Sequence, residues 1–199
     1  MEKRIVFATA NEGKMAEIRE ILADIGIAIY SMKEVGIEMD IIEDGDTFEE
    51  NALIKARAVA KLLPDDIVLA DDSGLEIDCL GGEPGVHTAR FGGVDTSYEE
   101  KMQLLLNKLQ GVPKEQRSAR FVCVIAARFP DRSEELTRDT IEGQIAIEVA
   151  GEYGFGYDPI FYLPELACTT AQLEPEKKHE LSHRGKALKK MRKILEKRA

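Results

Sequence analysis

The chain alternates short apolar runs with segments of helical periodicity, and this order limits its fold more than any other feature. Residues 3 to 9 and 26 to 31 have the length and the apolar content of strands. The segment between them, residues 13 to 25, carries apolar side chains at helical spacing, namely Met15, Ile18, Ile21, Leu22 and Ile25. Strands that alternate with such helices predict an α/β fold.

Later segments continue the alternation. Thr47 and Glu50 have the spacing of a capping box at the start of a helix over residues 47 to 63. The other expected elements are a buried strand at 67 to 70, a helix at 97 to 109, paired strands at 118 to 128 and about 139 to 149, and a final helix capped by Ser182. These neighbours predict a mixed sheet, and the lack of repeats and linkers predicts one domain over residues 1–199.

Charge and cysteine content exclude several classes of protein. The net charge of −10 argues against a general nucleic-acid binder. The apolar stretch Ile5–Ala8 is too short for a signal peptide and no run approaches the length of a membrane span, so we expect a cytoplasmic protein without a membrane partner. Cys79, Cys123 and Cys168 lack metal-site or disulfide spacing, which predicts small core residues.

The stretch RIVFATANEGK, residues 4 to 14, changes from a strand pattern to a turn and then to the start of a helix. Asn11 and Gly13 favour the turn, and Lys14 follows at the first helical positions. Free N–H groups at a helix N-terminus, with an ammonium nearby, suit phosphate oxygens. The stretch is therefore either a short phosphate-binding loop or only the turn that ends the first strand.

Two groups of carboxylates provide candidate metal ligands. Glu43 belongs to an acidic segment just before the helix that carries Lys55, where capping of that helix is the alternative explanation. In LADDSGL, residues 69 to 75, a buried strand ends in Asp71 and Asp72 before an expected Asp-Ser-Gly turn. Alternating side-chain direction sends one of these carboxylates toward the crevice at the strand ends, where it can hold a metal or accept a proton from water.

Two further motifs lie in the last third of the chain. In GFGYDPIF, residues 154 to 161, glycines allow close approach of the backbone to a ligand, Phe155 and Tyr157 offer aromatic faces, and a β-bulge is the alternative explanation. In LSHRG, His183 and Arg184 occupy the first turn of a helix, where cations oppose the helix dipole. This conflict indicates an electron-rich ligand or an acidic neighbour.

Taken in order, these motifs resemble those of the non-standard purine nucleoside triphosphate pyrophosphatases. The matching segments span nearly the whole chain and read FATANEGK, EDGDTFEENALIKA, LADDSGLEIDCLGGEPGVHTARF, FGYDPIF and LSHRGKAL. The resemblance implies hydrolysis of ITP, dITP and XTP to the nucleoside monophosphate and pyrophosphate, which cleanses the nucleotide pool. It also implies Mg²⁺ as cofactor, a homodimer, and an elongated α/β structure whose long mixed sheet and flanking helices form two lobes around a central cleft.

The resemblance also implies roles for individual residues. The triphosphate would be cradled by Thr9, Ala10, Asn11, Glu12, Gly13 and Lys14, with Lys55 adding a charge. Glu43 and Asp72 would hold Mg²⁺, Asp72 would act as general base and Ser73 would touch substrate. The base and sugar would meet Phe155, Gly156, Tyr157, Asp158, Lys178, His183 and Arg184. Ala10 departs from the pattern, since relatives often have glycine there.

This base site is chemically reasonable, because hypoxanthine and xanthine present a keto oxygen to cationic donors where adenine presents an amino group. Guanine shares that oxygen, so its rejection needs another contact. Two alternatives stay open. The first is a metal-dependent nucleotide hydrolase of different specificity, for instance one that acts on modified pyrimidine triphosphates or releases orthophosphate. The second is a nucleotide-binding regulatory protein in which Asp71 and Asp72 only form a turn.

Overall fold

The computed structural model of the protein describes residues 4–198 and has a mixed α/β fold, as expected. Its seven strands form one sheet in the order β2-β1-β3-β4-β5-β6-β7. The strands are β1 (Arg4–Phe7), β2 (Ala28–Ser31), β3 (Ile67–Ile77), β4 (Ser118–Arg128), β5 (Glu134–Ile145), β6 (Phe161–Leu163) and β7 (Cys168–Thr169). The α-helices are α1 (Glu12–Ile21), α2 (Phe48–Ala60), α3 (Tyr98–Lys108), α4 (Pro175–Leu181) and α5 (His183–Arg198). In the described part of the chain, no helix is long and apolar enough to cross a membrane.

The chain divides into two compact units, each assembled from separate stretches of sequence. The first unit contains the residues up to Asp72, then Cys123–Asp139, and the residues from Arg184 onward. The second contains Ser73–Val122 and Thr140–His183. The predicted elongated form and central cleft stay predictions.

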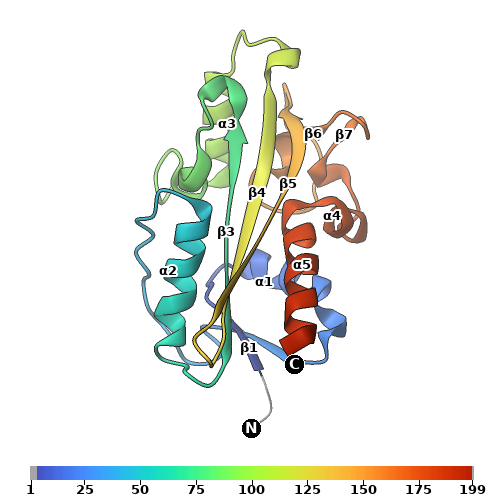
Figure 1. The fold of residues 1–199 in the computed structure, drawn as a ribbon. Helices are drawn as coiled ribbons and strands as arrows, with labels where there is room; N and C mark the ends of the chain where they lie inside the picture. Colours follow the sequence, from blue (N-terminus) through green and yellow to red (C-terminus); the bar gives the residue numbers. More distant parts are fainter. Residues whose placement is uncertain (1–3, 199) are drawn as a thin grey trace. The chain divides into compact units, whose positions relative to one another are not determined.

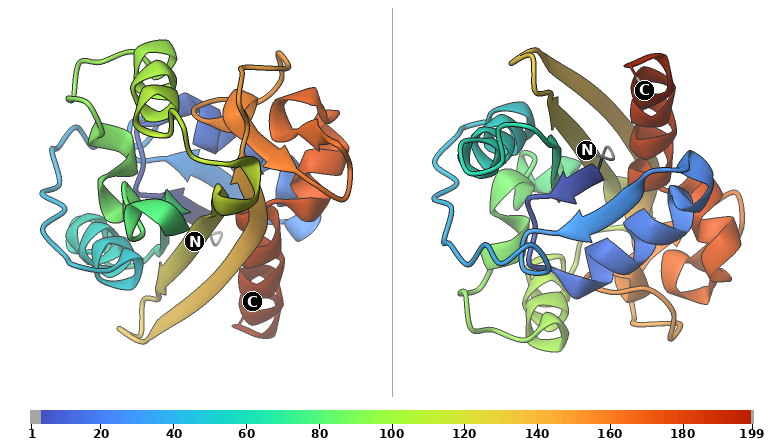
Figure 2. Two further views of the ribbon diagram at one scale, coloured as in Figure 1. Left: turned by 90° about the horizontal axis from the view of Figure 1, so that it is seen from above. Right: turned by 90° about the horizontal axis from the view of Figure 1, so that it is seen from below.

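In the first unit, β1 pairs in parallel with both β2 and β3. Helices α1 and α5 pack on one face of these strands through a buried apolar cluster that includes Ile18, Leu22, Leu188 and Met191. Helix α2 lies against the opposite face, as Figure 1 and the two views of Figure 2 show. Side chains that alternate along β3 therefore point toward different helices.

Helix α2 begins at the predicted capping box, which the structure confirms. The Oγ1 of Thr47 accepts a hydrogen bond from the N–H of Glu50 (3.1 Å), and the Glu50 carboxylate accepts one from the N–H of Thr47 (3.1 Å). Both otherwise unsatisfied backbone donors are paired, so the start of the helix is fixed.

In the second unit, α3 packs on the second half of β3, the first half of β4 and the end of β5. Its buried Leu105 and Leu109 belong to one apolar cluster with Leu75, Ile77 and Phe161. A second capping box, formed by Ser97 and Glu100, fixes the first turn of α3.

The predicted turn after Asp72 is wrong, because β3 continues through the acidic pair to Ile77. Leu75 and Ile77 are completely buried, and the Leu75 N–H donates to Thr88 Oγ1 at 2.8 Å. This apolar burial and hydrogen bond hold the Asp-Ser-Gly sequence extended despite its turn propensity. Asp71 and Asp72 thus lie inside a strand.

Other differences from the sequence analysis are smaller. Strand β5 begins and ends earlier than residues 139 to 149, and Ile147 and Val149 are exposed beyond its end. Helix α4 was not expected; it begins with a proline at its first position and is only seven residues long. Of the three cysteines only Cys123 is fully buried, while Cys79 is exposed, so the expectation of a core role is wrong for Cys79.

Candidate functional site

The turn between β1 and α1 caps the helix with Asn11. The Asn11 side-chain oxygen accepts the Lys14 N–H at 2.9 Å, and Thr9 Oγ1 accepts the Asn11 N–H at 3.2 Å. Ala10, Asn11 and Glu12 are exposed. The stretch is therefore a capped turn, and the Asn11 amide nitrogen remains suited to donate to an anion at this helix end.

Lys14 contacts Asp71, which also contacts Arg184. The Lys14 Nζ lies 3.0 Å from Asp71 Oδ2, and the Arg184 Nη2 lies 3.4 Å from the same oxygen. Burial alone would raise the pKa of Asp71, but the two cations outweigh it and hold this pKa well below its usual range. Asp71 is therefore a permanent anion that fixes two substrate-binding candidates.

Glu17 completes this cluster, although no motif in the sequence included it. Its carboxylate accepts a short hydrogen bond from Arg184 Nη1, and the residue is only 7% exposed. Signals were present in the sequence, because Glu17 lies beside Ile18 on the apolar side of α1 and Arg184 opposes the dipole of its own helix. The acidic neighbours that this opposition predicted for Arg184 are Glu17 and Asp71.

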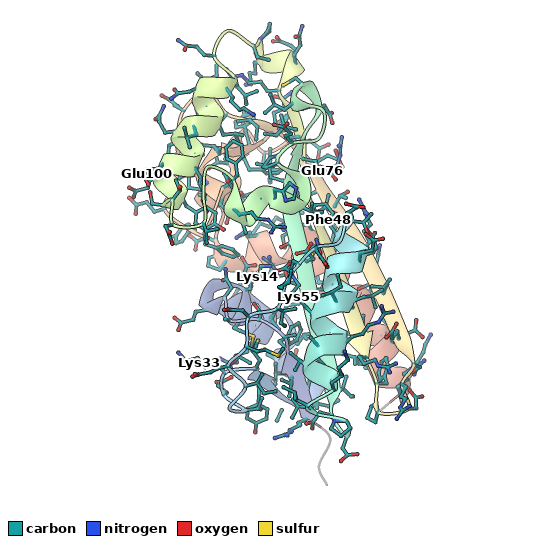
Figure 3. The ribbon with its side chains drawn as sticks, turned by 90° about the vertical axis from the view of Figure 1, so that its left-hand side faces the viewer. Lys14, Lys33, Phe48, Lys55, Glu76 and Glu100 are labelled. Carbon is teal, nitrogen blue, oxygen red and sulfur yellow. The ribbon has the colours of Figure 1, made fainter. Side chains whose placement is uncertain are left out.

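Lys55 joins the other two predicted carboxylates on the α2 side of β3. Its Nζ lies 2.6 Å from Glu43 Oε2 and 2.9 Å from Asp72 Oδ1. Burial would lower the pKa of Lys55, but Asp72, Asp71 and Glu43 together raise it, so the side chain stays charged. Figure 3 labels Lys55 on α2 and Lys14 on α1, and both cations act on the titration of Asp71 and Asp72.

Asp72 differs from its neighbour in the direction of its pKa shift. Burial raises the pKa of Asp72 to about 6 in spite of the opposing charge of Lys55. The neighbouring Asp71 faces α1 and α5, where two cations lower its pKa. Adjacent carboxylates on opposite faces of one strand thus differ in basicity: Asp71 is a weak base and Asp72 a stronger one.

The segment that carries Glu43 is fastened to α2 by Asn51. The Asn51 side chain accepts the Gly45 N–H at 2.9 Å and donates to the Gly45 carbonyl oxygen at 3.3 Å. A Cβ atom on Gly45 would lie 2.7 Å from the Cβ of Glu50, so only glycine fits at this close approach. The position of Glu43 therefore depends on Asn51 and Gly45.

Glu43 and Asp72 fit a hard divalent cation. Asp72 Oδ2 is buried and has no hydrogen-bond partner among residues 4–198, while the Glu43 side chain is 37% exposed. Within those same residues, no group of three or more His, Cys, Asp or Glu side chains could enclose a metal. Two carboxylates, with phosphates and waters as the other ligands, are typical of Mg²⁺ rather than of a closed structural site.

In the second unit, Asp158 organises the predicted base-binding residues. Its Oδ2 accepts from Lys178 Nζ at 2.6 Å and from the Phe155 N–H at 2.9 Å, and its Oδ1 accepts from Thr170 Oγ1 at 2.9 Å. The Lys178 ammonium also lies 5.2 Å from the centroid of the Phe155 ring. A buried, oriented cation beside an aromatic face is suited to a flat, keto-bearing ring.

A small cavity of about 10 Å³, room for roughly one water molecule, adjoins this group. The His183 ring stacks on Phe121 with centroids 4.9 Å apart and planes 17° apart. Residues that line the cavity include Phe121, Ile141, Asp158, Thr170, Lys178 and His183. The second unit therefore brings Asp158, Lys178 and His183 together around one cavity, and their contact with a base stays a prediction.

The loop of residues 154 to 158 uses its glycines and Tyr157 in ways that the sequence did not reveal. A Cβ on Gly154 would lie 2.2 Å from Asp158 Oδ2, and its φ is +78°, so glycine lets Asp158 fold back onto the loop. Tyr157 is only 2% exposed and donates its hydroxyl to the Thr88 carbonyl oxygen at 3.2 Å. Phe155 is the aromatic residue whose ring the loop leaves partly exposed.

The remaining predicted substrate contact, Ser73, is half-buried in β3 directly after Asp72.

The chain is similar to a known protein family over almost its whole length. The family model described as the Ham1 family matches residues 5–194. A Bacillus subtilis protein named dITP/XTP pyrophosphatase is 46% identical over 194 residues, which cover 98% of each chain.

Two solved structures are similar over almost their full length. The Staphylococcus aureus Ham1 protein superposes with a TM-score of 0.87 at 43% identity, covering 99% of this chain and 100% of that one. A HAM1 protein from Coxiella burnetii gives a TM-score of 0.88 at 41% identity, with 98% and 99% of the two chains covered.

Proposed function

The chain belongs to the Ham1 family, and from this premise we propose that it hydrolyses non-standard purine nucleoside triphosphates (dITP, ITP and XTP) to the nucleoside monophosphate and pyrophosphate. The observation that carries the proposal is the pair of adjacent carboxylates in β3. Asp71 is held ionised between Lys14 and Arg184, and Asp72 lies beside Lys55 with a raised pKa. Hydrolysis of a phosphoanhydride needs both fixed cations and a proton acceptor, and this strand positions both.

The triphosphate binds at the turn between β1 and α1. The N–H groups of the first turn of α1 and the Lys14 ammonium attract phosphate oxygens, while Asp71 keeps that ammonium in place. Lys55 adds a second charge and is positioned by Glu43 and Asp72. Because these cations are oriented before substrate arrives, little reorganisation is needed during the reaction.

Glu43 and Asp72 would hold Mg²⁺ together with the phosphates. When bound, the ion supplies positive charge that stabilises the oxygens of the reacting phosphate. The support in this chain is the buried, unpartnered Asp72 Oδ2 beside the half-buried Glu43.

Asp72 is the general base. A carboxylate with a pKa of about 6 is ionised at neutral pH and is still basic enough to take a proton from water. As Asp72 accepts that proton, the water oxygen bonds to the α-phosphorus. The bond from the α-phosphorus to the oxygen that bridges to the β-phosphorus breaks, and pyrophosphate leaves with that oxygen.

Lys178 reads the base. Its ammonium is oriented by Asp158 and lies near the Phe155 ring, so it can donate to the C6 oxygen of hypoxanthine or xanthine. Adenine would place an amino group against this donor, and unpaired buried polar groups can discriminate by a factor on the order of 10⁴. Arg184 and His183 would complete the base edge, in line with the family resemblance.

A substrate panel tests this function. With Mg²⁺, we expect fast conversion of dITP, ITP and XTP to monophosphate and pyrophosphate, and turnover of ATP and GTP slower by a factor on the order of 100 or more. EDTA is expected to stop the reaction, because without a bound cation Glu43 and Asp72 would place two negative charges beside the phosphates. Products are identified by anion-exchange chromatography.

The same panel separates the alternatives. Orthophosphate as product, equal rates with ATP and ITP, or faster turnover of modified pyrimidine triphosphates would each contradict the proposal. Tight nucleotide binding without any turnover would favour a regulatory protein instead.

We also propose that the protein is a cytoplasmic homodimer that does not bind nucleic acid. The family resemblance supports the dimer, and the second unit exposes Val94 (81%), Ile147 (69%) and Val149 (53%). Light scattering coupled to gel filtration is expected to give twice the 22.2 kDa of one chain. A mass of 22.2 kDa at micromolar concentration would contradict the dimer.

A further inference from the structure

Lys101 is a buried lysine that the proposed reaction does not use. It lies in α3, is 3% exposed, and donates from Nζ to the carbonyl oxygen of Ala89 at 2.6 Å. No carboxylate of residues 4–198 lies within ion-pair distance of it. Because burying an ammonium is unfavourable without compensation, its partners are informative.

One of these partners is the ring of Tyr98, one helical turn earlier in α3. The Lys101 Nζ lies 5.1 Å from the centroid of that ring, which is the geometry of a cation–π contact. Tyr98 is the first residue of α3, directly after Ser97 of the capping box, so its backbone position is fixed. Lys101 thus holds the Tyr98 ring from one side.

The Tyr98 ring packs against the loop that carries the predicted base contacts. It meets the Tyr157 ring edge-on, with centroids 5.5 Å apart and planes 89° apart. It also covers the backbone of Gly156, since a Cβ built there would lie 3.5 Å from the Tyr98 ring. Two of the residues expected to touch substrate therefore rest on one side chain of α3.

A second connection ties the same loop to the 3₁₀ helix Gly85–Arg90. Tyr157 donates its hydroxyl to the Thr88 carbonyl oxygen, and Lys101 donates to the next carbonyl along, that of Ala89. Thr88 itself is anchored to β3 through the Leu75 N–H. The side chains of Tyr98, Lys101 and Tyr157 therefore join the loop, α3 and the 3₁₀ helix. These contacts are separate from the hydrogen bond between Asp158 and Lys178.

We propose that Tyr98 and Lys101 are positioning residues for substrate binding, which hold the Phe155–Asp158 loop in the conformation that accepts the base and sugar. The expected effect on KM rests on the proposed function. The expected effect on the mobility of the loop does not depend on that function. A mobile loop would weaken substrate binding while the phosphate chemistry, carried by residues of β3, α1 and α2, stayed intact.

The test compares three variants with wild type. Y98A removes the ring, Y98F keeps it, and K101M keeps the apolar stem but removes the ammonium. We expect Y98A to raise KM for dITP roughly tenfold and K101M roughly threefold, with kcat within about twofold of wild type. Y98F is expected to retain the wild-type KM. Hydrogen–deuterium exchange of a peptide covering residues 150–162 is expected to speed up in Y98A and K101M but not in Y98F.

The control is Q103A, an exposed position of the same helix, which is expected to change neither readout. Unchanged KM and unchanged exchange in Y98A would overturn the inference, as would a loss confined to kcat. If the wild-type protein hydrolysed no nucleotide, the proposed function would fail, while the exchange experiment would still support or contradict the positioning of the loop.

Discussion

Replacement of Asp72 by asparagine is expected to abolish turnover, lowering kcat by about 10³-fold or more, while dITP still binds. Asparagine has nearly the same shape and still offers an oxygen to Lys55, but its amide cannot accept the proton of the attacking water. Asparagine also replaces one of the two carboxylates proposed to hold Mg²⁺, so kcat and KM are both measured at saturating Mg²⁺, where the loss should appear mainly in kcat. Pyrophosphate release measures kcat, and equilibrium binding of dITP to the variant by calorimetry measures affinity.

D44N is a matched control, because Asp44 is an exposed carboxylate of the segment that also carries Glu43. It is expected to keep wild-type kcat. Residual turnover of D72N within tenfold of wild type would exclude Asp72 as the general base. Greater damage to kcat from D71N, per folded molecule, would move that role to Asp71.

Replacement of Asp71 by asparagine is expected to act mainly on stability. Asp71 lies between Lys14 and Arg184, both held by the same carboxylate oxygen, and Arg184 is 3% exposed. In D71N Arg184 keeps Glu17 as its neighbouring carboxylate, and removing one partner from a buried ion pair costs about 3–5 kcal/mol. For a chain of this size, the expected fall in Tm is roughly 6–20 °C.

D72N is expected to lower Tm less than D71N does at pH 8 without metal, because Lys55 keeps Glu43 as a partner. A carboxyl whose folded pKa is lowered, as in Asp71, stabilises the fold above its ordinary pKa, and this stability is lost as the pH falls. A carboxyl whose folded pKa is raised, as in Asp72, contributes stability only at lower pH, and this contribution is lost as the pH rises through about 6. At pH 8 asparagine removes a charge whose burial is unfavourable, and this offsets part of the loss of the ion pair with Lys55.

Thermal unfolding followed by circular dichroism, with EDTA present, compares the two variants. A similar fall in Tm for D72N and D71N would contradict the opposite electrostatic environments described for the two side chains.

The sequence was most informative where local rules decide the structure. Thr47 and Glu50 predicted the start of α2, and the capping pattern does not depend on the rest of the chain. The five motifs also included residues that form ion pairs within one unit. These are Lys14, Lys55, Asp71 and Asp72 in the first unit, and Asp158 and Lys178 in the second. What the sequence could not supply was the extension of β3, because the local preference of Asp-Ser-Gly for a turn is overridden by burial of Leu75 and its hydrogen bond to Thr88.

Long-range pairs were the other limit. Glu17 and Arg184 are 167 positions apart in sequence, so neither residue's partner could be inferred from its neighbours. Tyr157 was expected to offer its ring to a ligand, yet the ring packs edge-on against Tyr98 and its hydroxyl donates to the Thr88 carbonyl oxygen. Local pattern indicated that these residues were unusual, and only tertiary packing determined how they are used.

The fastening of Gly45 by Asn51 has a consequence for how this chain tolerates insertions. The segment before Glu43 is tied at its start by the bond from the Ile37 N–H to the Met32 carbonyl oxygen (2.9 Å) and at its end by Asn51, and it has no regular secondary structure between them. Doubling the length of such a loop costs only about 0.6 kcal/mol in closure entropy. We therefore expect residues 38–42 to vary in number while Glu43 keeps its place, so that a tag or reporter can be inserted close to the proposed metal ligands.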